Sequence, residues 1–118
     1  MKDINLLKEN GVDVESAIEI LGDMDMYDEI LNDFLEVSEE RMPKLEEYKN
    51  VGDMKNYAIE VHALKSDSKY LGFTKLADMA LEHQLKSEEN NIDYINEHYN
   101  ELIMEANNKI NLVKKYLN

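Results

Sequence analysis

Hydrophobic side chains recur along most of the chain at the three- and four-residue spacing of amphipathic helices. Two short stretches of this kind, Ile4–Lys8 and Val14–Leu21, stand at the start. A longer apolar stripe begins near Tyr27 and continues to about Tyr48. Pro43 falls inside this stripe. Because proline has no backbone N–H group, we expect it to kink this helix or to break it into two.

Three further helices follow, and the pattern places them at about 54–71, 74–89 and 92–117. Asp53 is a suitable N-cap for the first, while Gly72 and Asn90-Asn91 mark the turns that come after. The last helix has the most regular apolar spacing, with Ile95, Tyr99, Leu102, Ala106, Ile110, Val113 and Leu117. We therefore expect one continuous buried stripe along it.

Long helices at about 24–48, 54–71, 74–89 and 92–117, joined by short turns, pack most simply as an antiparallel up-down-up-down four-helix bundle. The two short N-terminal helices would cover one end of the bundle. With 118 residues, no internal repeat and no long linker, residues 1–118 should form a single domain. Only 4 glycines and 1 proline are too few for the turns of a many-stranded sheet, so the expected fold class is all-α.

Composition excludes several kinds of chemistry and partner. The chain has no cysteine, which excludes disulfides and thiolate sites. Its 26 acidic and 13 basic residues give a net charge of −13, so phosphate backbones would be repelled and nucleic acid is not an expected partner. The sequence shows no apolar run long enough for a membrane span and no signal peptide at its N-terminus. We therefore expect a cytoplasmic protein with no membrane partner.

His62 lies on the polar side of the predicted helix 54–71. At about 100° per residue, it falls roughly 130° from the centre of the apolar stripe. That stripe consists of Met54, Tyr57, Val61, Leu64, Ser68 and Leu71. Lys55, Lys65 and Lys69 share the face of His62, in a segment that holds few acids. Two interpretations stay open from spacing alone: an anion site around an exposed imidazole, or an ordinary solvated histidine.

The residues around His62 would leave its ring accessible. Ala58 and Ser66 are small and lie about one turn to either side. Ile59 places an apolar side chain beside the imidazole, which suits the surface of a protein partner. Together with Lys55, these residues form the expected docking surface around the histidine.

The segment His62–Gly72 resembles the signature of the histidine-containing phosphotransfer (HPt) domain. That signature is roughly His-x-Leu-Lys-Gly/Ser-x-Ser/Ala-x-x-Leu/Ile-Gly, followed at four-residue intervals by Leu and a small residue, here Leu76 and Ala80. The resemblance extends over nearly the whole chain. It implies a four-helix bundle with the histidine on the second long helix, which agrees with the helix pattern.

The resemblance implies a role for each matching position. His62 would be the phosphoacceptor, and Lys65 would lie beside the phosphoryl group and offset its charge, with Lys69 contributing on the same face. Ser66 stands where the family often has Gly, and it would have to stay small so that a partner can approach. Two positions, His83 and Gln84, differ from the common family pattern, which has an apolar residue and Glu there. The motif positions with a structural role would be Ser68 and Gly72.

The resemblance implies a phosphorelay function within two-component signal transduction. The chain would accept a phosphoryl group from the aspartyl phosphate of a response-regulator receiver domain and pass it to another receiver, downstream of a sensor (hybrid) histidine kinase. No phosphate-binding loop for ATP is present, so the chain would be a phosphocarrier and not an enzyme. It would need no cofactor of its own, since Mg²⁺ would be bound by the receiver, and it would be a monomer.

Two other functions fit the sequence less well. A non-phosphorylated helical-bundle adaptor could dock receiver or kinase domains, but the presence of both His62 and Lys65 favours the phosphocarrier. A small helical enzyme is disfavoured because His62 has no base or orienting acid at helical spacing. No metal site is expected, because the residues three positions before the histidines are Ile59, Ala80 and Ile95, and a di-iron bundle needs Glu there.

Overall fold

In a computed structural model that describes residues 2–118, the chain forms six α-helices, and the described residues contain no strand. Met1, the first residue of the predicted domain, lies outside the described residues. Two short helices, α1 (Ile4–Glu9) and α2 (Val14–Leu21), come first. The long helices are α3 (Met24–Val51), α4 (Met54–Leu71), α5 (Thr74–Glu88) and α6 (Ile92–Leu117). The predicted all-α class is therefore confirmed.

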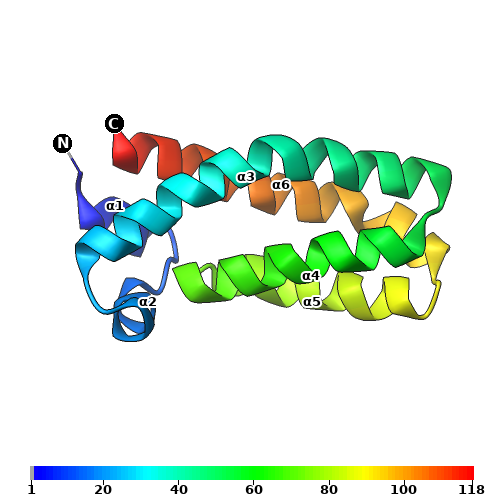
Figure 1. The fold of residues 1–118 in the computed structure, drawn as a ribbon, viewed down its shortest axis with the longest axis horizontal. Helices are drawn as coiled ribbons and strands as arrows, with labels where there is room; N and C mark the ends of the chain where they lie inside the picture. Colours follow the sequence, from blue (N-terminus) through cyan, green and yellow to red (C-terminus); the bar gives the residue numbers. More distant parts are fainter. Residues whose placement is uncertain (1) are drawn as a thin grey trace.

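The four long helices lie side by side along a molecule of 42 × 23 × 20 Å, and each runs opposite to the one before it (Figure 1). The two short helices lie at the end of the bundle where α4 finishes and α5 begins (Figure 1). There α1 packs against α6, and α2 packs against α3 and α4. Among the described residues, no helix has the length and apolarity of a bilayer-spanning segment.

Aspartate and asparagine side chains begin five of the six helices. Each accepts a hydrogen bond from a backbone N–H in the first turn, which would otherwise have no partner inside the helix. The capping residues are Asp3, Asp13, Asp23, Asp53 and Asn91. Hydrogen bonds from Ser16 lower the pKa of Asp13, and hydrogen bonds from Asn56 lower the pKa of Asp53. Part of the acidity of the chain thus serves to start its helices, and the N-cap predicted at Asp53 is confirmed.

Pro43 does not break the third helix, so that part of the expectation is wrong. α3 is one helix of 28 residues that contains Pro43 and ends three residues beyond the predicted limit of 48. The missing N–H of Pro43 would have bonded the carbonyl of Glu39, four residues earlier. Both residues are exposed, so water can satisfy that carbonyl. Buried residues on either side, such as Phe34 and Leu45, hold both halves of the helix to the core.

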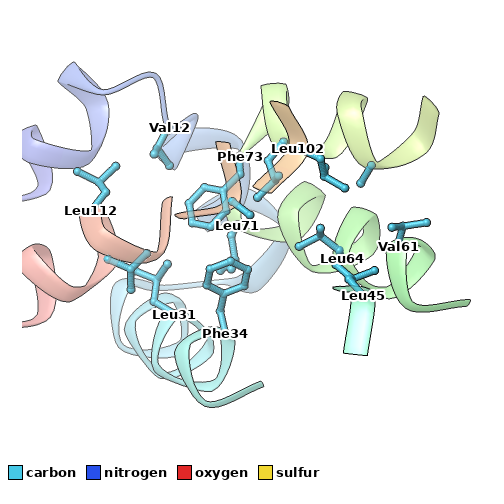
Figure 2. Packing of buried hydrophobic residues seen from close by; sticks show 14 of the residues in the cluster. Val12, Leu31, Phe34, Leu45, Val61, Leu64, Leu71, Phe73, Leu102 and Leu112 are labelled. Atoms are coloured by element: carbon cyan, nitrogen blue, oxygen red, sulfur yellow. The ribbon is translucent and has the colours of Figure 1, made fainter. Parts of the chain in front are cut away.

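The core runs between the four long helices and includes the turn from α4 to α5. Figure 2 shows Phe34 of α3 pointing toward Leu71 and Phe73. The rings of Phe34 and Phe73 meet edge to face, with centroids 5.3 Å apart. The hydroxyl of the buried Tyr27 donates a hydrogen bond of 2.9 Å to the carbonyl of Leu71. This packing fixes the C-terminal end of α4, the helix that contains His62.

The buried stripe of α6 departs from the expectation near its end. Ile110 and Leu117 are only partly buried, whereas Leu112 and Tyr116 are buried. The buried face changes because α1 packs against α6, where it covers residues that the four-helix pattern would leave in solvent. The Tyr116 hydroxyl also donates a 2.7 Å hydrogen bond to Asp28 Oδ1 of α3.

Candidate functional site

α4 presents His62 on its exposed side, opposite the buried stripe. The six residues predicted for that stripe are all buried: Met54, Tyr57, Val61, Leu64, Ser68 and Leu71. His62 itself is exposed. The helical period of the apolar residues therefore fixes the direction of the imidazole, since any rotation of α4 that buried His62 would expose the stripe.

Gln84 of α5 lies against the His62 ring. Its side-chain oxygen Oε1 is 3.0 Å from His62 Nδ1. A carbonyl oxygen only accepts hydrogen bonds, so this contact requires a hydrogen on Nδ1. In the neutral ring the lone pair is then on Nε2, which has no hydrogen-bond partner among the described residues. Nε2 is therefore the ring nitrogen whose lone pair can react with an incoming group.

A groove of about 680 Å³ runs beside this pair, between α4 and α5. Three of the four residues expected on the docking surface, Lys55, Ala58 and Ile59, line the groove together with His62 and Gln84. The α5 wall is continued by Ser87 and Glu88. Ser66, the fourth expected residue, is partly exposed on α4 and does not line the groove.

The three lysines predicted near His62 are not neutralised by ion pairs. Lys55 and Lys69 are exposed and Lys65 is partly exposed. Within residues 2–118, none of the three forms a salt bridge. Their positive charge therefore stays available on the face of α4 that presents the imidazole, where it would attract an anion.

The two acids of α4 are paired with Arg41 of α3. Arg41 Nη2 lies 3.1 Å from Asp67 Oδ2, and Arg41 Nε lies 3.5 Å from Glu60 Oε1. The arginine side chain is 5% exposed. Asp67 thus faces α3 and points away from His62, as its position in the helical period predicts. Both carboxylates of α4 therefore contact Arg41 and not the lysines of the same helix.

The two motif residues expected to be structural lie in the interior. Ser68 is fully buried, and its hydroxyl has no hydrogen-bond partner among the described residues. Gly72 ends α4 with φ +81°, and a Cβ atom there would collide with the backbone carbonyl of Asp13. The carbonyl of Gly72 accepts a 2.9 Å hydrogen bond from the Asp13 N–H. Glycine is needed at this position both for the left-handed backbone and for the close approach of the chain that leads into α2.

His83 is a core residue and not part of the exposed site. It is 2% exposed, and a 2.9 Å hydrogen bond joins its Nδ1 to the hydroxyl of Tyr57 on α4. Burial lowers the pKa of His83 to about 4, and the nearby His98 acts in the same direction. The ring is therefore neutral at cellular pH and serves as a polar link between α4 and α5. Among residues 2–118, no group of histidines and acids is placed to hold a metal ion.

Sequence reasoning singled out His62 and the lysines but missed the contact made by Gln84. A signal for it was present in the helix pattern. His62 and Gln84 lie at equal distances, eleven residues, before and after Phe73 in the turn between α4 and α5. In an antiparallel helix pair, positions equidistant from the turn lie opposite each other.

Comparison with known protein families identifies the Hpt domain. The family model of the Hpt domain matches residues 29–107, which is more than half of the chain and includes all of α4 and α5. No curated protein and no solved structure matches the chain significantly.

Proposed function

Because this chain belongs to the Hpt-domain family, we propose that it is a histidine phosphocarrier of a phosphorelay, with His62 as the phosphoacceptor. Hpt domains are phosphocarriers that work with receiver domains and histidine kinases in two-component systems. The observation that supports the assignment of His62 is its exposed ring, with Nδ1 bonded to Gln84 and Nε2 open to an incoming group.

The proposed reaction is a phosphoryl transfer to His62 Nε2. The lone pair of Nε2 attacks the phosphorus of an aspartyl phosphate on a receiver domain, and a bond from nitrogen to phosphorus forms. The bond from phosphorus to the aspartyl oxygen breaks, and the carboxylate leaves with the electron pair. Nδ1 keeps its hydrogen, so the ring becomes positively charged and the Gln84 carbonyl stabilises it. Transfer to a second receiver is the reverse of this step.

Lys65 and Lys69 would stabilise the negative charge of the bound phosphoryl group. Both are on α4, one and two turns after His62, and both are free of ion pairs among the described residues. Lys55, Ala58, Ile59 and Ser66 would contact the receiver. The receiver would bring the Mg²⁺ ion, and no cofactor is assigned to this chain.

Label transfer from a receiver domain tests the proposal. The chain is incubated with a receiver phosphorylated with ³²P, and the label on each protein is followed. We expect the wild-type chain to take up label, His62→Gln to take up none, and Lys65→Ala to take it up more slowly. Lys114→Ala, which removes an exposed lysine from α6, is the control and should behave as wild type.

Two outcomes would count against the phosphocarrier. Label that persists in His62→Gln would refute the acceptor assignment. A receiver that binds the chain without any transfer of label would favour an adaptor that docks receivers. His98→Gln, which replaces a partly exposed histidine of α6, is the control for the loss of a histidine in general.

A further inference from the structure

We infer that Glu88 is a positioning residue which sets the orientation of the Gln84 amide and thereby selects the nucleophilic tautomer of His62. The inference rests on the proposed function, and it concerns which of the two ring nitrogens has the lone pair. Glu88 itself does not touch the imidazole. It acts through one side chain, Gln84, which lies between the two.

His62, Gln84 and Glu88 form a chain of two hydrogen bonds, in which His62 donates to Gln84 and Gln84 donates to Glu88. Gln84 Nε2 donates to Glu88 Oε2 at 3.5 Å, and Gln84 Oε1 accepts from His62 Nδ1 at 3.0 Å. Gln84 and Glu88 are four residues apart on α5, so they share a face of that helix. All three residues line the same groove.

The primary amide of Gln84 has two opposite ends, and only one orientation suits the chemistry. With Oε1 toward the ring, Nδ1 has the hydrogen and Nε2 has the lone pair. With the amide turned over, its NH₂ group would donate to a lone pair on Nδ1, and the hydrogen would be on the exposed Nε2. That tautomer cannot attack phosphorus through the accessible nitrogen. The rate of transfer therefore depends on which end of the amide faces the histidine.

A carboxylate is the group that resolves this choice, because it accepts hydrogen bonds and cannot donate them when ionised. Glu88 would be repelled by Oε1 and attracted by the NH₂ group, so it favours the orientation that the structure shows. Its neighbours do not compete for the role. Ser87 donates its hydroxyl to the backbone carbonyl of Gln84, and Lys86 pairs with Glu89. Among the described residues Glu88 forms no salt bridge, so it is available to the amide.

The test uses the unphosphorylated chain and reads the tautomer of His62 directly. Nitrogen-15 NMR distinguishes a ring nitrogen with a hydrogen from one with a lone pair, at a pH where the imidazole is neutral. We expect the Nδ1–H form to dominate in the wild type. Glu88→Lys replaces the acceptor by a donor, and should make the Nε2–H form dominant. A single hydrogen bond of this kind corresponds to a change of about two- to tenfold in the tautomer ratio.

A matched control separates orientation from net charge. Glu82→Lys makes the same change of charge on an exposed position of α5 that lies away from the groove. It should leave the tautomer ratio of His62 unchanged. Equal ratios in Glu88→Lys, Glu82→Lys and the wild type would overturn the inference. A shift of the same size in both variants would overturn it as well, because a charge effect would then be sufficient.

A second variant removes the amide and tests whether Glu88 acts through it. In Gln84→Glu there are two equivalent oxygens, so either one accepts from Nδ1–H and there is no orientation to select. Adding Glu88→Lys to this variant should leave the tautomer unchanged, and a further shift would contradict the proposed route. Because these spectra need no receiver domain, their outcome is independent of label transfer. If Glu88→Lys shifts the tautomer ratio of His62 but His62→Gln still takes up label, the phosphoacceptor assignment fails while the orienting role of Glu88 stands.

Discussion

Arg41 Nη2 lies 3.1 Å from Asp67 Oδ2 and connects the interior of α3 to the helix that contains the candidate phosphoacceptor. A nearly buried arginine is uncommon, and it is tolerated where carboxylates balance its charge. Here the second carboxylate is Glu60, also on α4. The pairing has two effects. It neutralises the charge of Arg41 in the interface between α3 and α4. It also pairs both acidic residues of α4 on the side of the helix away from His62.

Replacing Arg41 by Met should destabilise the protein by about 3 kcal/mol, at the lower end of the range for breaking a buried ion pair because Asp67 stays partly exposed. Unfolding by urea, followed by circular dichroism, measures this loss. The variant Arg41→Met/Glu60→Gln/Asp67→Asn should regain most of it, since no unpaired carboxylate is left. Lys44→Met, at an exposed position of α3, is the control with little expected change. Equal stabilities of the single and triple variants would contradict this account.

Replacing Gly72 by Ala should be more harmful than replacing Gly22 by Ala. Both glycines have positive φ, +81° and +104°, so alanine is strained at either. Only at Gly72 would the added Cβ collide with the backbone of Asp13, whereas open space surrounds Gly22. The collision should add about 1–3 kcal/mol to the cost. Thermal unfolding of the two variants gives the difference, and similar losses would mean that Asp13 moves aside freely.

The unfolding free energy of the wild type should fall as the pH is lowered from about 6.5 to about 4, in part because of His83. Its pKa in the folded state is about 4, against an ordinary value of 6.5. Between pH 6.5 and pH 4 the unfolded chain binds a proton at His83 and the folded chain does not, so protonation favours unfolding. The stability that is present above pH 6.5 is therefore lost as the pH falls toward 4. At about 1.4 kcal/mol per unit of pKa, the loss is at most about 3 kcal/mol.

His83→Gln isolates this contribution, because the other titrating groups are common to both proteins. Near neutral pH the variant should be less stable than the wild type, since the buried hydroxyl of Tyr57 loses its usual partner. The gap in unfolding free energy should then narrow as the pH approaches 4. Urea titrations at several pH values measure it. A gap that stays constant between pH 7 and 4 would show that His83 titrates normally in the folded protein.

Replacing Ile59 by Glu should weaken binding of a receiver domain without changing the fold. Ile59 is 58% exposed beside the groove, so its substitution removes apolar contact area and places a negative charge in the interface. A loss of at least about fivefold in affinity is expected for a residue that contributes more than 1 kcal/mol. Met104→Glu, at a position 67% exposed on α6, is the matched control. Calorimetric titration of both variants with one receiver measures the two affinities, and equal affinities would contradict the prediction.

Much of the fold could be predicted from the sequence, because the apolar residues of α4 repeat with the helical period and leave only one orientation for His62. The expectation of a break at Pro43 came from its missing N–H and not from the spacing, and burial on both sides keeps α3 intact despite a lost hydrogen bond. The spacing did mispredict the buried face in the last turns of α6, since the contact with α1 joins residues far apart in sequence. Local patterns do not encode such contacts.

The part of the candidate site that lies on α4 alone could be predicted from the sequence. The contacts between α4 and its neighbouring helices could not. Lys65 and Lys69 share the face of His62 through helical spacing alone. The contact of Gln84 with the imidazole requires the register of α5 against α4, and the pairing of Arg41 with Asp67 requires that of α3. The registers between these helices are set by core packing and by the turn at Gly72. The spacing of residues within a single helix does not determine them.

The hydrogen bond from the Asp13 N–H to the Gly72 carbonyl has a practical consequence for anyone who shortens this chain. A fragment trimmed to the family-matched residues 29–107 would lack α1, α2 and the last turns of α6. It would uncover Leu71 and Phe73, which are now inaccessible to water, just where α4 ends. The smallest excisable unit therefore starts no later than Asp3, the residue that caps α1, and extends to Tyr116.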